Sequence, residues 1–140
     1  MTIYADTSVL IAFVFDEPDS DRVRDWFRRT TQRIIVSDLA RLEFPAVVTR
    51  SARTRRLNPS EASAALASFD LLAARSHPLS HDRADFAGAE ALVRDFMTKL
   101  TAPDALHLAS AKNAGATLAT LDLRLAGAAR AQGLALAELG

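Results

Sequence analysis

The feature that most constrains the fold is an alternation, along the whole chain, of short strand-like runs with longer segments of helical periodicity. Five runs have the length and composition of strands: residues 3–5, 34–36, 77–80, 116–121 and 134–137. Short apolar strands separated by helices indicate a parallel sheet that is covered by helices on both faces. We therefore predict one domain over residues 1–140, of the three-layer α/β/α class, with a parallel sheet of four to five strands.

The segments between these runs carry apolar residues three and four positions apart, which is the spacing of one helix face. The clearest helix start is Asn58-Pro59-Ser60-Glu61, where an N-cap residue precedes a proline and a glutamate follows three positions later. Pro45 lies inside another helical segment and would end or kink it unless it lies in the first turn. The expected helices are residues 7–15, 19–31, 39–53, 58–75, 84–98, 101–113 and 122–132.

Composition excludes several kinds of chemistry. The chain has no cysteine, which excludes disulfides, zinc ribbons, iron–sulfur clusters and thiol nucleophiles. Its longest apolar run, residues 9–15, is well short of the roughly 20 residues that span a bilayer. No basic segment precedes an apolar stretch at the N-terminus, as it would in a signal peptide. We expect a soluble, cytoplasmic protein that does not contact membranes.

Acidic residues follow the predicted strands at the edge where an α/β sheet binds its ligands. Asp6 comes directly after the first strand and Asp122 directly after the fourth. Asp104 stands at the start of the helix that leads into the fourth strand, and Glu43 lies in the helix after the second. Ligands bind at the carboxyl ends of such strands, where the strand order reverses. If the first and fourth strands are neighbours, the four carboxylates converge.

Each of these acids also has a purely structural interpretation. Asp6 and Asp122 stand where helix N-caps belong, Asp104 fits a capping box with Thr101, and Glu43 fits a solvated helix face. As a group they are harder to explain, because two like charges about 4 Å apart repel by about 4 kcal/mol at an effective dielectric constant of about 20. Four carboxylates in one small area must be protonated or hold a cation.

An all-oxygen donor set without cysteine favours Mg²⁺ or Mn²⁺ over zinc. Ions held by carboxylates activate water and stabilise the leaving oxygen in phosphodiester cleavage. We predict Asp6 and Asp104 as the principal metal ligands and Asp122 as a further ligand. Glu43 is predicted to be either a ligand or the general base.

Three hydroxyl residues stand beside these acids: Thr7, Ser8 and Thr120. They are expected to orient a carboxylate or hold water around the ion. Capping and turn formation explain them equally well.

Four segments of the chain resemble the acidic motifs of PIN-domain ribonucleases, most closely those of the VapC toxins of type II toxin–antitoxin systems. They are Asp6-Thr7-Ser8-Val9-Leu10, Ser37-Asp38-Leu39-Ala40-Arg41-Leu42-Glu43, Pro103-Asp104-Ala105-Leu106-His107-Leu108-Ala109 and Ala119-Thr120-Leu121-Asp122-Leu123-Arg124-Leu125. The match keeps the order and spacing of the motifs over essentially the whole chain. In it, Asp6, Glu43, Asp104 and Asp122 correspond to the family's acidic quartet. Thr120 corresponds to the Ser or Thr that the family has two positions before the last acid.

The resemblance implies more than the spacing of the acids does. It implies a five-stranded sheet and a Mg²⁺- or Mn²⁺-dependent endoribonuclease that arrests translation by cleaving transfer, ribosomal or messenger RNA. It also implies a homodimer and inhibition by a cognate VapB-type antitoxin, whose C-terminal segment occupies the acidic cleft. Pro45 follows Glu43 by two positions, so the reach of Glu43 into the site depends on the course of that helix.

Two groups of arginines have both a functional and a structural interpretation. The first group follows the third predicted helix and is a candidate for binding RNA phosphates: Arg50, Arg53, Arg55 and Arg56. The second lies on the second predicted helix and fits a solvated face better: Arg22, Arg24, Arg28 and Arg29.

Two further features are also ambiguous. His107 lies three residues after Asp104, close to the same helix face, and we expect it to be packed rather than to act in acid–base catalysis. An apolar stripe is either core or a surface for a partner helix: Ala62, Leu66, Phe69 and Leu72.

Two other functions remain open at this point. A receiver-like signalling domain also gathers aspartates at strand ends, but it would need a pair of acids at the first strand and a lysine after the last. Only Asp6 stands at the first strand, and neither Lys99 nor Lys112 is suitably placed. A PIN-like module that binds without catalysis is the other alternative.

Overall fold

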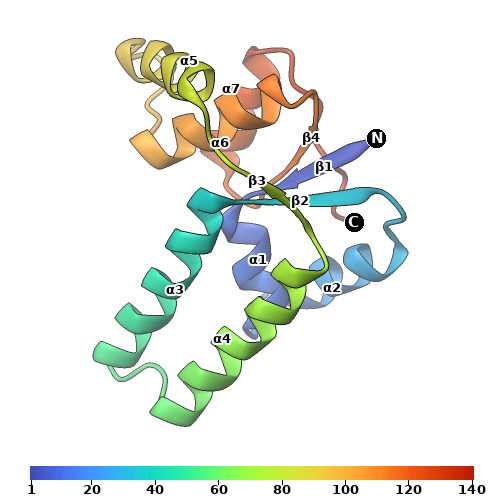
Figure 1. Cartoon of the computed structure of the whole chain (residues 1–140), viewed down its shortest axis with the longest axis vertical. Helices are drawn as coiled ribbons and strands as arrows, with labels where there is room; N and C mark the ends of the chain where they lie inside the picture. The colour runs from blue at the N-terminus through green and yellow to red at the C-terminus, as the bar shows by residue number, and fades with distance from the viewer.

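The computed structural model describes all 140 residues and contains four strands and seven helices. The strands are β1 (Thr2–Ala5), β2 (Arg33–Ser37), β3 (His77–Leu79) and β4 (Thr117–Ala119). The helices are α1 (Thr7–Val14), α2 (Ser20–Arg29), α3 (Asp38–Arg53), α4 (Pro59–Ala74), α5 (Arg83–Arg94), α6 (Ala102–Asn113) and α7 (Leu123–Ala131). Helices lie on both sides of the sheet, which confirms the predicted three-layer class (Figure 1).

The order of the strands fixes where a ligand site can lie. All four strands are parallel, in the order β3-β2-β1-β4. Successive strands are added outward from β1 to β3, and the chain then returns to place β4 on the other side of β1. The strand order therefore reverses between β1 and β4, and a crevice is expected at the carboxyl ends of these two strands. Their pairing, with Ala5 opposite Ala119, is the neighbour relation on which the convergence of the acids depends.

The two faces of the sheet are buried by different helices. Tyr4, Ile35 and Leu118 pack into one apolar cluster with residues of α5, α6 and α7. The next residues along two of these strands, Ala5 and Val36, pack on the opposite face with residues of α1, α3 and α4. This alternation follows from the two-residue period of a strand, and it explains why the strands are apolar on both faces.

Two predicted elements are shorter than expected because side chains bind the backbone that would have continued them. The predicted helix 84–98 ends at Arg94. Beyond it, the Asp95 carboxylate accepts from Met97 N at 3.0 Å, and Thr98 Oγ1 donates to Leu92 O at 2.9 Å. Such local bonds compete with the helix ladder. The predicted strand 116–121 ends at Ala119, because the following amides donate to side chains of the site described below.

The predicted last strand, 134–137, is reduced to a single parallel bridge between Leu136 and Leu118. Leu118 N donates to Ala135 O at 2.9 Å, and Ala137 N donates to Leu118 O at 2.8 Å. The sheet therefore has four strands with one bridged residue beside β4. It does not have the full fifth strand that the resemblance implies.

Pro45 does not end its helix, and the predicted helix over residues 39–53 is confirmed. Helix α3 runs through it from Asp38 to Arg53. A proline removes one hydrogen bond from the helix interior. Phe44, directly before Pro45, and Val48, three residues after it, are fully buried, and their packing offsets this loss.

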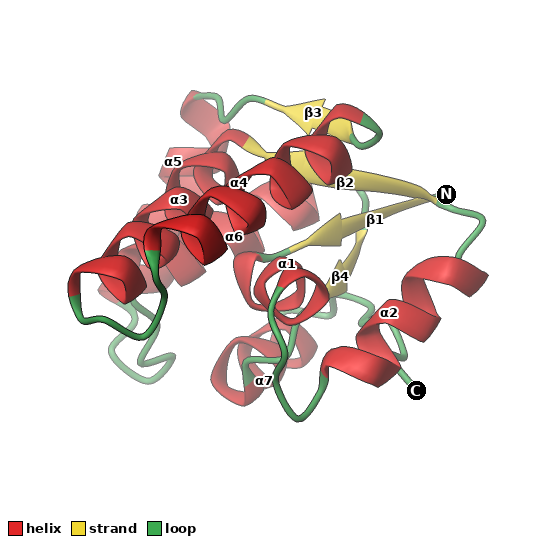
Figure 2. Cartoon of the chain, turned by 90° about the horizontal axis from the view of Figure 1, so that it is seen from below, coloured by secondary structure: helices red, strands yellow, loops and turns green.

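Helices α3 and α4 lie side by side as a hairpin (Figure 2). Aromatic stacking holds the two helices together. The rings of Phe44 and Phe69 stack with centroids 4.2 Å apart. Phe69 is buried, whereas Ala62, Leu66 and Leu72 are partly buried against the same cluster. The apolar stripe of α4 is therefore mainly core. No helix of the structure has both the length and the apolar character needed to cross a membrane.

We predict that Phe69→Ala lowers the free energy of unfolding by about 3–5 kcal/mol, because it removes a buried ring and leaves a cavity. Leu71→Ala on the same helix is the matched control. Leu71 is 66% exposed, so its loss should change stability by no more than about 0.5 kcal/mol. Urea denaturation of both variants tests this, and equal losses would show that the α3–α4 hairpin is not packed as described.

Candidate active site

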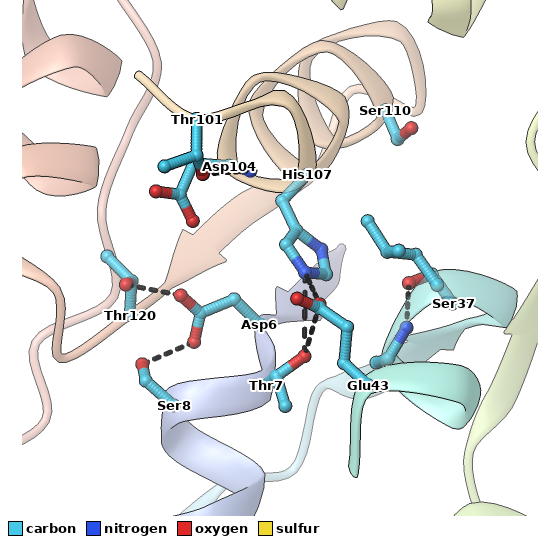
Figure 3. A network of polar contacts seen from close by, with 12 residues as sticks. Asp6, Thr7, Ser8, Ser37, Glu43, Thr101, Asp104, His107, Ser110 and Thr120 are labelled. Atoms are coloured by element: carbon cyan, nitrogen blue, oxygen red, sulfur yellow. Dashed lines mark hydrogen bonds and ion pairs between the residues drawn. The ribbon is translucent and has the colours of Figure 1, made fainter. Parts of the chain in front are cut away.

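The acids predicted from sequence lie around the carboxyl ends of β1 and β4, and Figure 3 shows three of them, Asp6, Glu43 and Asp104. Asp6 follows β1 directly, and Asp122 follows β4 after the two-residue turn Thr120-Leu121. Asp104 enters from the first turn of α6, and Glu43 from the second turn of α3. Each acid comes from a different segment of the chain, so only the tertiary fold brings the acids to one edge of the sheet.

Asp6 is the most buried acid of the site, at 4% exposure. Its two carboxylate oxygens accept from different hydroxyls: Oδ1 from Ser8 and Oδ2 from Thr120, each at 2.5 Å. Oδ1 also accepts from Val9 N at 3.2 Å, so Asp6 is the N-cap of α1 as well. Burial raises the pKa of Asp6 above its usual range despite these hydrogen bonds. The negative charge of Asp6 is therefore costly unless a cation lies nearby.

Ser8 and Thr120 also fix the turn that follows β4. The hydroxyl of Ser8 accepts from Leu121 N at 2.9 Å, and that of Thr120 accepts from Asp122 N at 3.0 Å. Each hydroxyl therefore donates to Asp6 and accepts from the turn. This arrangement ties the end of β1 to the end of β4 and sets the position of Asp122.

Asp122 is the N-cap of α7, as its structural interpretation proposed. Its Oδ1 accepts from Arg124 N at 2.9 Å and from Leu125 N at 3.1 Å. Both bonds use the same oxygen, so the cap leaves Oδ2 without a hydrogen-bond partner in the chain. Capping and ion binding are therefore compatible at this residue.

Asp104 is not held by a capping box. Thr101 caps α6 by accepting from Asp104 N at 3.4 Å, but the reciprocal bond from Thr101 N to the Asp104 side chain, present in the boxes of α4 and α5, does not form. Burial raises the pKa of Asp104, and the negative charges of Asp122 and Glu43 raise it further. The charges of the other acids thus affect the pKa of Asp104. Its carboxyl group points toward the side of the site where Asp6 lies (Figure 3).

Glu43 is not a solvated helix residue. Its Oε1 accepts from Thr7 Oγ1 at 2.8 Å and lies 2.5 Å from Nε2 of His107. Burial acts to raise the pKa of Glu43, but the hydrogen bonds from His107 and Thr7 outweigh it and lower the pKa. Among the hydroxyls predicted to serve the site, Ser8 and Thr120 bind Asp6, and Thr7 binds Glu43.

Sequence reasoning missed two participants in this network. His107 is buried, as expected, but it also contacts Glu43 and the hydroxyl of Tyr4, the latter at 2.7 Å from Nδ1. The three-residue spacing between Asp104 and His107 was a usable signal, because it places both on one side of α6. Nothing in the sequence marks Tyr4, which sits inside an apolar strand.

The donor set agrees in kind with a hard divalent cation. The acids offer only oxygen ligands, and burial raises the pKa values of Asp6 and Asp104. As the side chains stand, however, no three His, Asp or Glu residues form a group that could hold an ion. The residues fit the ion by the chemistry of their oxygen donors.

The two arginine groups differ in their contacts. On α2, Arg22 pairs with Asp19 at 2.8 Å, Arg24 pairs with Asp16 at 3.0 Å, and Arg28 pairs with Asp25, as expected of a solvated, ion-paired face. The other group is exposed and forms no ion pair, and it lies at the α3–α4 turn: Arg50, Arg53, Arg55 and Arg56. Arg53 is ten residues beyond Glu43 on α3, about 15 Å along the helix axis.

The sequence matches the family model of the PIN domain over residues 3–131. No curated protein is significantly similar to the chain in sequence. Among solved structures, DNA-bound VapBC from Salmonella typhimurium superposes with a TM-score of 0.76 at 17% identity, over 100% of this chain and 99% of that chain. FitAcB from Neisseria gonorrhoeae gives 0.73 at 20% identity, over 98% and 97%.

A third similar structure is VapC20 from Mycobacterium tuberculosis, described as a toxin that cleaves the sarcin-ricin loop. It superposes with a TM-score of 0.70 at 19% identity, over 90% of this chain and 94% of that chain. At these identities the structures share the fold. A receiver-like signalling domain does not agree with the family match.

The raised pKa of Asp6 predicts a pH-dependent cost to folding. A carboxyl group whose pKa is higher in the folded state makes stability fall as pH rises from the ordinary value of 3.8 to the raised value. Above that window the cost is fully present. In EDTA, Asp6→Asn should therefore be more stable than the wild type at pH 7, and this advantage should shrink as pH is lowered through 3.8.

Denaturant unfolding at pH 7 and at acid pH measures this difference, and Asp70→Asn provides the control. Asp70 is exposed on α4 and makes no hydrogen bond or ion pair, so its variant should follow the wild type at both pH values. A stability difference for Asp6→Asn that does not vary with pH would contradict the assignment of a buried charge.

Proposed function

Because the chain belongs to the PIN-domain family, we propose that it is a divalent-metal-dependent endoribonuclease and the toxin of a toxin–antitoxin pair. The observation that carries the proposal is the convergence of acids at the ends of β1 and β4. The negative charges of Asp122 and Glu43 contribute there to the raised pKa of Asp104. A cluster of carboxylates with two raised pKa values is not expected to bind a neutral or anionic ligand by itself. It suits a cation that in turn binds a phosphodiester.

In this proposal Asp6, Asp104 and Asp122 hold the ion, and Glu43 is a further ligand or the general base. When bound, Mg²⁺ or Mn²⁺ lowers the pKa of an attacking water and offsets negative charge on the phosphate.

The chain's own groups supply orientation and proton transfer. Ser8 and Thr120 keep both oxygens of Asp6 in place by donating to them. Glu43, whose lowered pKa keeps it ionised, can accept a proton from water.

The partners proposed for the chain are an RNA substrate, a VapB-type antitoxin and a second copy of itself. The similar structures include VapBC from Salmonella typhimurium and a toxin–antitoxin complex from Klebsiella pneumoniae, and VapC20 is described as a toxin that cleaves the sarcin-ricin loop. These likenesses support the antitoxin and the RNA substrate. We propose that RNA cleavage in the cytoplasm arrests translation and that the antitoxin blocks it by occupying the acidic edge.

A PIN-like module that binds without catalysis is the competing function. It is favoured by one observation: no three acids or histidines are grouped around an ion position as the side chains stand. The two functions differ in whether purified protein cleaves RNA with Mg²⁺ or Mn²⁺ and stops when EDTA is added.

Asp6→Asn and Asp104→Asn should each abolish metal-dependent cleavage. Loss of an outer-shell partner commonly costs 10- to 100-fold, and loss of a ligand should reduce the rate by more than about 100-fold. Cleavage of mixed-sequence RNA, with fragment ends mapped by sequencing, provides the measurement, and Asp70→Asn is the control that should cleave normally. Undiminished cleavage by folded Asp6→Asn would refute the proposed site.

The exposed arginines of the α3–α4 turn should bind RNA phosphates outside the acidic edge. Replacing Arg50, Arg53, Arg55 and Arg56 with Gln should weaken RNA binding and reduce the slope of log affinity against log salt concentration. The reduction should reach about 2.8 for four contacts to single-stranded RNA.

Binding is measured in the cleavage-deficient Asp6→Asn background. Replacing the ion-paired Arg22, Arg24 and Arg28 with Gln is the comparison and should change the slope much less. Equal slopes for the two sets would remove the α3–α4 turn from the RNA-binding surface.

A further inference from the structure

Glu43 is joined to the protein core by a chain of side-chain contacts that none of the acidic motifs requires. Tyr4 of β1 places its hydroxyl 2.7 Å from Nδ1 of His107, and Nε2 of His107 lies 2.5 Å from Oε1 of Glu43. Tyr4 is fully buried, and the side chain of His107 is 3% exposed, whereas that of Glu43 is 29% exposed. The chain of contacts therefore runs from the centre of the sheet outward to the active-site edge.

The chemistry of the groups fixes the direction of these hydrogen bonds. An ionised carboxylate can only accept, so Nε2 of His107 carries the proton that it shares with Glu43. Burial raises the pKa of Tyr4, so the phenol keeps its proton and can donate it to Nδ1. One neutral tautomer of His107 thus satisfies both contacts, with Tyr4 setting which ring nitrogen is protonated.

These contacts engage only one of the two carboxylate oxygens of Glu43. Thr7 and His107 both bind Oε1, and Oε2 has no hydrogen-bond partner in the chain. A glutamate on a helix surface would otherwise sample many rotamers. Donors from two directions hold this one in a single orientation, with one oxygen free for water or for an ion.

The course of α3 explains why Glu43 needs this support. Pro45 follows two residues later and cannot donate to the carbonyl of Arg41, so the helix ladder is incomplete beside Glu43. His107 is anchored independently, because α6 is almost wholly buried from Ala105 to Ala111. The buried helix α6 thus positions the side chain of Glu43 through His107, because α3 by itself holds Glu43 less firmly.

We propose that His107, held in one tautomer by Tyr4, is a positioning residue that preorganises Glu43 for metal binding and cleavage. The inference rests on the proposed function and assigns to His107 a role beyond packing. Residues that orient a metal ligand or a general base commonly contribute 10- to 100-fold to affinity or rate.

Three variants of the full-length protein separate hydrogen bonding from packing. His107→Phe keeps a ring but removes both nitrogens, His107→Gln retains a side-chain N–H donor, and Tyr4→Phe removes only the hydroxyl. His77→Gln is the control, because His77 is an exposed histidine far along the chain from the site. Thermal melting identifies which variants remain folded.

Two readouts are independent of cleavage. In the metal-free wild type, the Nε2 proton of His107 should be visible by NMR and protected from solvent exchange, and Glu43→Gln should shift its resonance. Calorimetric titration with Mn²⁺ should show affinity about 10-fold weaker in His107→Phe and largely restored in His107→Gln.

Cleavage kinetics provide the third readout. In His107→Phe, kcat should fall about 10- to 100-fold while KM for RNA changes little, because His107 does not contact RNA. Tyr4→Phe should lower kcat by a smaller factor, and His107→Gln should recover most of the loss. If His107→Phe does not fold, His107→Gln and Tyr4→Phe carry the comparison.

Several results would overturn the inference without affecting the proposed function. These are wild-type cleavage and Mn²⁺ affinity in folded His107→Phe, tighter Mn²⁺ binding in that variant, or equal defects in His107→Phe and His107→Gln. Failure of the proposed function looks different, since the wild type would then cleave no better than Asp6→Asn. In that case a freely exchanging His107 proton would refute the inference, and a protected one that responds to Glu43→Gln would support it.

Discussion

The structure of the site depends on one buried carboxylate, that of Asp6, at the point where β1 and β4 meet. An ionised group at 4% exposure needs hydrogen bonds to both oxygens, and Ser8 and Thr120 provide them. The same hydroxyls accept hydrogen bonds from amides of the turn after β4. The groups that bind Asp6 therefore also set the end of that strand and the position of Asp122. The pKa of Asp6 stays raised all the same. The fold thus accommodates a charge that it does not neutralise.

The acids fall into two environments with opposite effects on their pKa values. Asp6 and Asp104 have raised pKa values, because burial dominates and, at Asp104, the charges of Asp122 and Glu43 add to it. Glu43 has a lowered pKa, because the donors His107 and Thr7 outweigh burial. Carboxyl groups whose environments separate their pKa values commonly divide a reaction between them. This separation supports the proposed roles, in which Asp6 and Asp104 hold the ion and Glu43 is a further ligand or the general base.

The sequence predicted the local elements well where a side chain marks their ends. The box formed by Asn58 and Glu61 begins α4 as expected. The prediction was wrong where a distant or competing contact decides the outcome. Thr98 and Asp95 bind the backbone and end α5 early. The last predicted strand reaches β4 at only one residue, Leu136.

By itself, the sequence determined the class of fold, the parallel sheet and the candidate acids, because hydrophobic periodicity and the positions of acids after strands are local properties. Only the tertiary structure decided how those acids are used. It showed that Thr7 binds Glu43 and not Asp6, and that Tyr4 reaches His107. These contacts join residues as much as 103 positions apart, as Tyr4 and His107 are, so no local pattern records them. They arise when the strand order places β1 between β2 and β4 and packs α6 against its end.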